Sequence, residues 1–144
     1  MYQARAARGF TLLEIMVVVV IIGILAALIA PNVIGNVGKA QIERVKADVK
    51  SLGTTLEMYN LDNFAFPSTE QGLAALVSKP GGQPEALNWR SGGYLSGGLP
   101  KDPWGTPYQY LQPGQHGTFD VYSLGADRRA GGEGENADIG NWAK

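Results

Sequence analysis

The stretch "FTLLEIMVVVVIIGILAALIA", residues 10–30, decides the fold because it is long and apolar enough to form a helix in lipid. It contains 21 residues, and Thr11 and Glu14 carry its only polar side chains. As a helix it would be about 32 Å long, which is enough to cross a bilayer. We therefore expect a transmembrane or filament-core helix at 10–30 and a globular domain at 31–144.

Charged residues around this stretch predict its orientation. Arg5 and Arg8 precede it, and the next basic residue is Lys39. The positive-inside rule then places the N-terminus in the cytoplasm and the later domain across the membrane. A secretory signal has a shorter apolar region and a small-residue cleavage site, whereas this stretch is followed at once by Pro31. A conventional cleaved signal peptide is therefore not expected.

Glu14 is the unusual residue of the stretch, because a carboxylate within hydrocarbon costs a few kcal/mol and usually has a partner. Its helical neighbours contain no cation; they are Phe10, Thr11, Val17 and Val18. A cut between Gly9 and Phe10 would create an α-amino group on each copy, a cation near neutral pH. At an effective dielectric constant of about 20, such a pair 4 Å apart attracts by about 4 kcal/mol. We expect Glu14 to bind the N-terminus of a second copy and so to set the stagger between copies.

Composition excludes several classes of function. The formal net charge is −1, so the chain has no strong basic field that would bind nucleic acid. It contains no cysteine, which removes disulfides, thiol nucleophiles and cysteine-based zinc sites. The single histidine, His116, lies in "PGQHG" and is expected to be a solvated turn residue. We therefore do not expect an enzyme.

The helix is expected to weaken after the apolar stretch. Pro31 costs about 3 kcal/mol in a helix interior, and Gly35 and Gly38 cost about 1 kcal/mol each relative to alanine. We expect a kink or local melting from Pro31 to Gly38, especially in an assembled filament. The alternative is that neighbouring helices tolerate these residues, as membrane helices often do.

Farther along, apolar residues spaced three and four apart predict one buried helical face that packs on a small sheet. They are Ile42, Val45, Val49, Leu52, Leu56 and Tyr59. A coiled coil with a partner is the alternative, but the pattern covers too few heptads to favour it.

Shorter patterns predict the rest of the domain. Ser68 and Gln71 form a capping-box pattern that would open a short second helix ending at Pro80. Residues 80–98 are rich in glycine and proline and predict a surface loop. A β-hairpin is expected around "PGQHG", and a third strand is expected near 93–95. The fold class expected is α+β: a long N-terminal helix packed on a small antiparallel sheet, with a glycine-rich C-terminal loop.

The leader ending in Gly9, followed by the apolar stretch, resembles the N-terminus of type IV pilin-like proteins. Five further segments resemble the major pseudopilin family of bacterial type II secretion systems: "DNFAFPSTEQGLAALV" (62–77), "LPKDPWGTPYQY" (99–110), "PGQHG" (113–117), "YSLGAD" (122–127) and "ADIGNW" (137–142). The resemblance implies a leader peptide at 1–9, cleavage between Gly9 and Phe10 by prepilin peptidase, and N-methylation of Phe10. It also implies assembly through Phe10 and Glu14.

The C-terminal loop is a candidate ion site, because Ca²⁺ prefers six to eight oxygen ligands and a glycine-rich loop can supply them. Its oxygen donors include Asp127, Glu133, Glu135, Asn136 and Asp138. The resemblance implies calcium bound by Asp127, by Asp138 and by the main-chain carbonyl of Leu124. Ala137 stands where the family often has an acid, so Glu133, Glu135 or Asn136 is expected to replace that ligand.

The function implied by the resemblance is that of a structural subunit. It would form a homopolymer from the bacterial inner membrane and drive export, together with minor pseudopilins and an inner-membrane assembly platform. The alternative among assembly proteins is a major type IV pilin for adhesion or motility, which commonly contains a disulfide that this chain cannot form. From another class, the alternative is a membrane-anchored hydrolase or solute-binding module.

Overall fold

The computed structural model describes residues 9–143, with side chains for 9–27 and 37–143. Of the expected leader, only Gly9 falls among the described residues. The chain divides into two compact units, one ending at Val37 and the other beginning at Gly38. Helix α1, Leu12–Asn63, contains 52 residues and contributes to both units.

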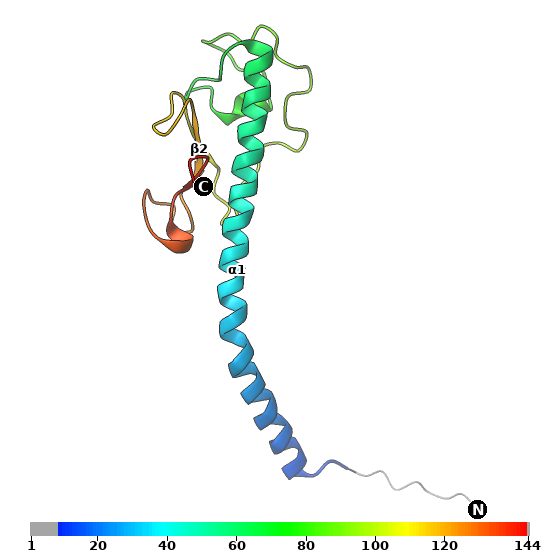
Figure 1. Ribbon diagram of the computed structural model, residues 1–144. Helices are drawn as coiled ribbons and strands as arrows, with labels where there is room; N and C mark the ends of the chain where they lie inside the picture. The colour runs from blue at the N-terminus through cyan, green and yellow to red at the C-terminus, as the bar shows by residue number, and fades with distance from the viewer. Residues whose placement is uncertain (1–8, 144) are drawn as a thin grey trace, which may run out of the picture. The chain divides into compact units, whose positions relative to one another are not determined.

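The second unit is built on the buried face of α1. Val45, Val49, Leu52, Leu56 and Tyr59 are each at most 3% exposed, and Ile42 is partly buried against them. Figure 1 shows the strands and loops of this unit beside the later part of α1. The helical periodicity therefore predicted the core face correctly.

The sheet has three antiparallel strands in the order β1-β2-β3. They are β1 (Gln109–Leu111), β2 (Asp120–Ser123) and β3 (Ile139–Gly140). Tyr110 pairs with Val121, and Ser123 pairs with Ile139. The α+β fold and the hairpin are confirmed.

The predicted position of the third strand was wrong. Residues 93–95 bind the end of a short helix instead, because the backbone N–H groups of Tyr94 and Leu95 donate to the Leu76 carbonyl at 2.7 and 3.3 Å. Gly93 has φ +80°, and a Cβ there would lie 3.0 Å from the carbonyl oxygens of Leu76 and Val77. This left-handed, close-packed backbone cannot continue as a strand.

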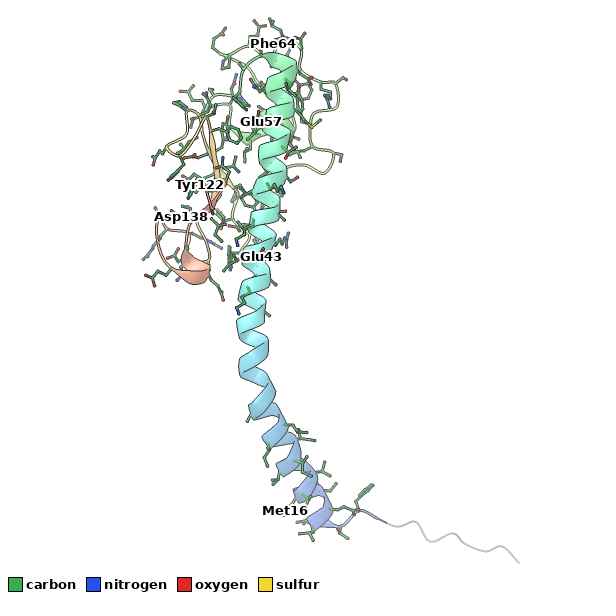
Figure 2. The ribbon with its side chains drawn as sticks, in the orientation of Figure 1. Met16, Glu43, Glu57, Phe64, Tyr122 and Asp138 are labelled. Atoms are coloured by element: carbon green, nitrogen blue, oxygen red, sulfur yellow. The ribbon has the colours of Figure 1, made fainter. Side chains whose placement is uncertain are left out.

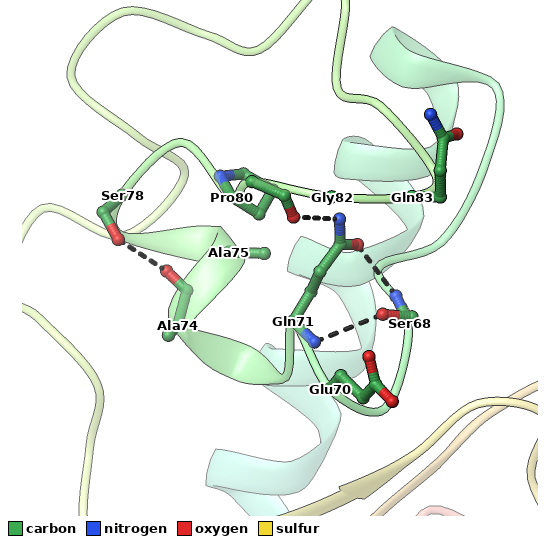
Figure 3. A pocket seen from close by; sticks show the side chains of 10 residues that line it. Ser68, Glu70, Gln71, Ala74, Ala75, Ser78, Pro80, Gly82 and Gln83 are labelled. Atoms are coloured by element: carbon green, nitrogen blue, oxygen red, sulfur yellow. Dashed lines mark hydrogen bonds between the residues drawn. The ribbon is translucent and has the colours of Figure 1, made fainter.

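The second helix is shorter than expected. It is the 3₁₀ helix η1, Leu73–Leu76, because Gly72 has φ +60° and ends the preceding turns. The capping-box pattern is confirmed: Gln71 N–H donates to Ser68 Oγ at 3.2 Å, and Ser68 N–H donates to Gln71 Oε1 at 3.0 Å. The Gln71 amide also donates to the Gly81 carbonyl (Figure 3). It donates to the Pro84 carbonyl as well, and these bonds tie the surface loop to this turn.

Candidate functional site

The N-terminal site begins with Thr11 and Glu14 at the start of α1. The Glu14 N–H donates to Thr11 Oγ1, and the Thr11 N–H donates to a Glu14 carboxylate oxygen, both at 3.3 Å. This is a reciprocal capping box, with Thr11 as N-cap and Glu14 three residues later. Sequence reasoning missed it, although the Thr-x-x-Glu spacing signals it. The carboxylate therefore has a donor within its own chain.

Around Glu14 the surface of α1 is apolar. The large apolar side chains from Phe10 to Leu25 are each between 48% and 80% exposed. A soluble protein rarely exposes so long an apolar surface, so this part of α1 is suited to contact with lipid or with other copies. Figure 2 shows Met16 in this apolar part of α1 and Glu43 farther along the helix.

Within 9–27 and 37–143, the structure contains no helix that is long and apolar enough to cross a membrane. Residues 28–30 of the expected span lie outside the residues whose side chains are described, as do Pro31 and Gly35. The backbone of α1 is helical from Leu12 to Asn63, and the expected melting of residues 31–38 in a filament stays a prediction.

The second candidate site is the loop between β2 and β3. Gly125 has φ +71°, and its backbone packs against the main chain of residues 135–137. The Ala126 N–H donates at 2.9 Å to the carbonyl of Glu135, which is the middle residue of the short helix η2, Gly134–Asn136. This cross-link brings the beginning and the end of the loop together, so Leu124 and Asp127 lie near 135–138 in the fold.

The Asp138 carboxylate has an oxygen whose hydrogen-bonding capacity is not used. Its Oδ2 accepts from the Gly131 N–H at 2.9 Å, whereas its Oδ1 is buried without a hydrogen-bond partner among the described residues. A buried carboxylate oxygen without a donor is costly unless a cation or water binds it. The donor set, carboxylates with main-chain carbonyls, suits Ca²⁺.

The other predicted ligands are arranged differently. Asp127 Oδ1 accepts from the Arg129 N–H at 3.0 Å. The Glu135 carboxylate lies against Gly38 of α1, in the place that a Cβ on Gly38 would occupy. Within the described part of the chain, no three Asp, Glu or His side chains are grouped closely enough to hold a metal ion. An ion in this loop would therefore depend strongly on main-chain carbonyls.

His116 is exposed in the hairpin loop, as expected, but its ring also makes two contacts that were not expected. Its Nδ1 lies 3.0 Å from Asp120 Oδ2, and its ring stacks on Trp142 with centroids 4.0 Å apart. A Cβ on Gly140 would collide with the Trp142 ring, so glycine in β3 lets the indole lie across the strand. The stack joins the hairpin loop to the end of the chain, which local sequence could not reveal.

A family model described as "Prokaryotic N-terminal methylation motif" matches residues 4–30, and one described as "Type II secretion system (T2SS), protein G" matches residues 32–142. The crystal structure of the major pseudopilin from the type 2 secretion system of enterohaemorrhagic Escherichia coli is similar, with a TM-score of 0.68 and 51% identity. That match covers 78% of this chain and 95% of the solved one. The fold is thus that of a pseudopilin.

Relatives described as type II secretion system core protein G match nearly the full length. The one from Pseudomonas aeruginosa is 59% identical, with 97% of this chain and 98% of the relative covered. The one from Vibrio cholerae is 56% identical, with 99% and 96% covered. The chain therefore belongs to the type II secretion system protein G family, and its function is that of a major pseudopilin, a structural subunit. The alternative of a type IV pilin for adhesion or motility is not favoured.

Proposed function

We propose that the chain is cut after Gly9 by prepilin peptidase, methylated on Phe10, and anchored in the bacterial inner membrane by residues 10–30. Its N-terminus would be cytoplasmic and its second unit periplasmic. Copies would then polymerise into a periplasmic pseudopilus, with minor pseudopilins and an inner-membrane assembly platform, to drive protein export across the outer membrane. The observation that supports this most directly is the exposed apolar surface from Phe10 to Leu25, with Glu14 as its one charge.

Processing is tested by mass spectrometry of the membrane-extracted chain. The expected product lacks residues 1–9 and carries one added methyl group on Phe10. Loss of Arg5 and Arg8 would also change the formal side-chain charge from −1 to −3. An intact Met1 would contradict the proposal.

In the polymer, Glu14 would bind the new α-amino group of an adjacent copy. The capping box complicates this assignment, because an acid at the third helical position can serve only its own helix. The charge is what distinguishes the two roles. Glutamine keeps the capping acceptor, whereas it cannot form an ion pair.

We therefore predict that Glu14→Gln prevents polymer formation nearly as fully as Glu14→Ala does. The measurement is the fraction of pseudopilin in filaments, with Glu57→Ala, an exposed acid later on α1, as the matched control. Loss of about 4 kcal/mol per contact corresponds to roughly a thousandfold weaker association. Normal filaments of the Gln variant would show that Glu14 acts as a cap alone.

The segment that contains Pro31, Gly35 and Gly38 would lose helical structure when the polymer forms. The low helix propensity of these residues supports this proposal, since little stability is lost when the helix opens there. A melted segment would let the filament extend without disturbing either unit.

We further propose that the loop from Leu124 to Asp138 binds Ca²⁺. Asp127 and Asp138 would supply carboxylate oxygens, Leu124 a main-chain carbonyl, and Asn136 a further oxygen. The partnerless Asp138 Oδ1 supports the proposal. A bound cation would neutralise this buried oxygen and hold the two ends of the loop together.

Two measurements on the processed protein test this site: the heat of binding in a calorimetric titration with Ca²⁺, and the Tm with and without Ca²⁺. Binding should raise the Tm by several degrees at millimolar Ca²⁺, and Asp138→Ala should abolish the shift. Glu70→Ala, which removes an exposed acid outside the loop, is the control. Absence of both heat and thermal shift in the unaltered protein would rule calcium out.

A further inference from the structure

The Glu135 carboxylate occupies an unusual position on α1. The place where a Cβ of Gly38 would lie coincides with Glu135 Oε1, and the Cδ and Cγ atoms of Glu135 are also close to it. In an α-helix the Cα–Cβ bond tilts toward the N-terminus of the helix. The carboxylate therefore lies on the N-terminal side of Gly38.

The carboxylate would have a role as an acceptor if α1 were interrupted immediately before Gly38. The backbone N–H groups of residues 38–41 would then lose their acceptors and become the free donors at a new helix N-terminus. An N-cap side chain normally supplies an acceptor for such donors, and its side chain starts from the Cβ of the cap residue. Gly38 has no side chain, and Glu135 places an anionic oxygen where that side chain would begin.

Two further observations and a general property of helices support this assignment. The boundary between the two compact units falls between Val37 and Gly38, at the same residue. The Glu135 main chain is held in place, because its carbonyl accepts from the Ala126 N–H at 2.9 Å and packs on Gly125. A carboxylate at a helix N-terminus also interacts favourably with the helix dipole.

We propose that, when the segment from Pro31 to Gly38 loses helical structure in the polymer, the helix restarts with Gly38 at its N-cap position, and Glu135 supplies the capping oxygen from the C-terminal loop. The role of Glu135 is then to protect the remaining helix and the core face that begins at Ile42. This inference rests on the proposed melting of the segment. It is separate from calcium binding, for which the carboxylates of Asp127 and Asp138 are proposed.

The test is amide hydrogen exchange, resolved by residue, on the processed full-length protein as monomer in detergent and as isolated polymer. In the polymer, Glu135→Ala should speed exchange of the amides of 38–41 by about threefold to tenfold, as expected for loss of an N-cap. In the monomer, where these amides bond within a continuous helix, the same variant should have little effect. Glu135→Gln keeps an acceptor without the charge. In the polymer, its exchange rate at 38–41 should therefore lie between those of the unaltered protein and Glu135→Ala.

Glu133→Ala is the matched control, because it removes an exposed acid from the same loop. Unchanged exchange at 124–138 in each variant shows that the loop itself is intact. If residues 31–37 stay protected in the unaltered polymer, the melting proposal and this inference both fail. If residues 31–37 exchange but Glu135→Ala matches Glu133→Ala at 38–41, the melting stands and only the role of Glu135 is overturned.

Discussion

Tyr108 shows how a single residue joins α1 to the sheet region. It is 6% exposed, and its hydroxyl donates to Asp48 Oδ2 on α1 at 2.8 Å. Burial, and then the hydrogen bond to Asp48 and the charge of that carboxylate, raise the pKa of Tyr108 well above its ordinary value. The neutral phenol is therefore the form that the fold stabilises.

We predict that the protein loses stability as the pH rises above 10. Because the pKa of Tyr108 is raised in the folded state, the unfolded state releases its proton first, and the free energy of unfolding falls with pH. Tyr108→Phe should lower the free energy of unfolding by about 1 kcal/mol at pH 7 and make the alkaline decline shallower. Urea unfolding between pH 8 and 11 measures both effects.

Tyr122→Phe is the control for this experiment, since no hydrogen bond of the Tyr122 hydroxyl is present within the described residues. An alkaline decline that is the same in the Tyr108 and Tyr122 variants would contradict the prediction. Some decline should remain in both, because burial also raises the pKa of Tyr110.

At the scale of elements, the turn in "DPWG" is held by Asp102, which is 3% exposed. Its Oδ1 accepts from the Thr106 N–H at 2.6 Å and its Oδ2 from the Ser123 hydroxyl, also at 2.6 Å. Ser123 Oγ in turn accepts from the Gly125 N–H at 3.1 Å. The turn is thereby connected through β2 to the first residues of the C-terminal loop.

Asp102→Ala should lower the free energy of unfolding by about 2 to 4 kcal/mol, because it leaves several buried donors without an acceptor. Asp102→Asn should cost less, about 1 to 2 kcal/mol, since one oxygen remains for the backbone N–H groups. Chemical denaturation measures the difference, with Glu70→Ala, an exposed acid, as reference. Equal stability of the Asp102→Ala and Glu70→Ala proteins would show that the turn does not depend on this carboxylate.

At the scale of the whole molecule, the hydrophobic core is contained in the second unit. Its buried members begin at Val45 and end at Ile139. The described side chains before Val37 are exposed, including the apolar ones up to Leu25. The first unit therefore contributes a surface for assembly and little to the folding of the second.

A fragment of residues 38–144 should accordingly fold by itself and remain soluble. We expect cooperative thermal unfolding with a Tm within a few degrees of that of the full chain, because no member of the core is removed. The same fragment should form no filaments, which electron microscopy and sedimentation would show. A non-cooperative transition would mean that residues before Gly38 are needed for the fold.

The features that sequence could predict depend on neighbours along the chain. Local spacing predicted a helix through the apolar stretch, the core face from Ile42 to Tyr59 and the Ser68–Gln71 capping box. The backbone geometry of a helix or turn translates such spacing directly into structure. The leader ending in Gly9, together with the apolar stretch that follows it, resembled the N-terminus of pilin-like proteins, and the match of residues 4–30 to the N-terminal methylation motif agrees with that resemblance.

The remaining features were decided by tertiary structure. A strand of two residues such as Ile139–Gly140 has no periodicity to detect, and only pairing with β2 makes it a strand. The stack of Trp142 on His116, and the position of Glu135 at Gly38, join residues that lie 26 or more positions apart. Such contacts depend on how the chain folds back on itself, because no local propensity encodes which distant residue fills the space beside a glycine.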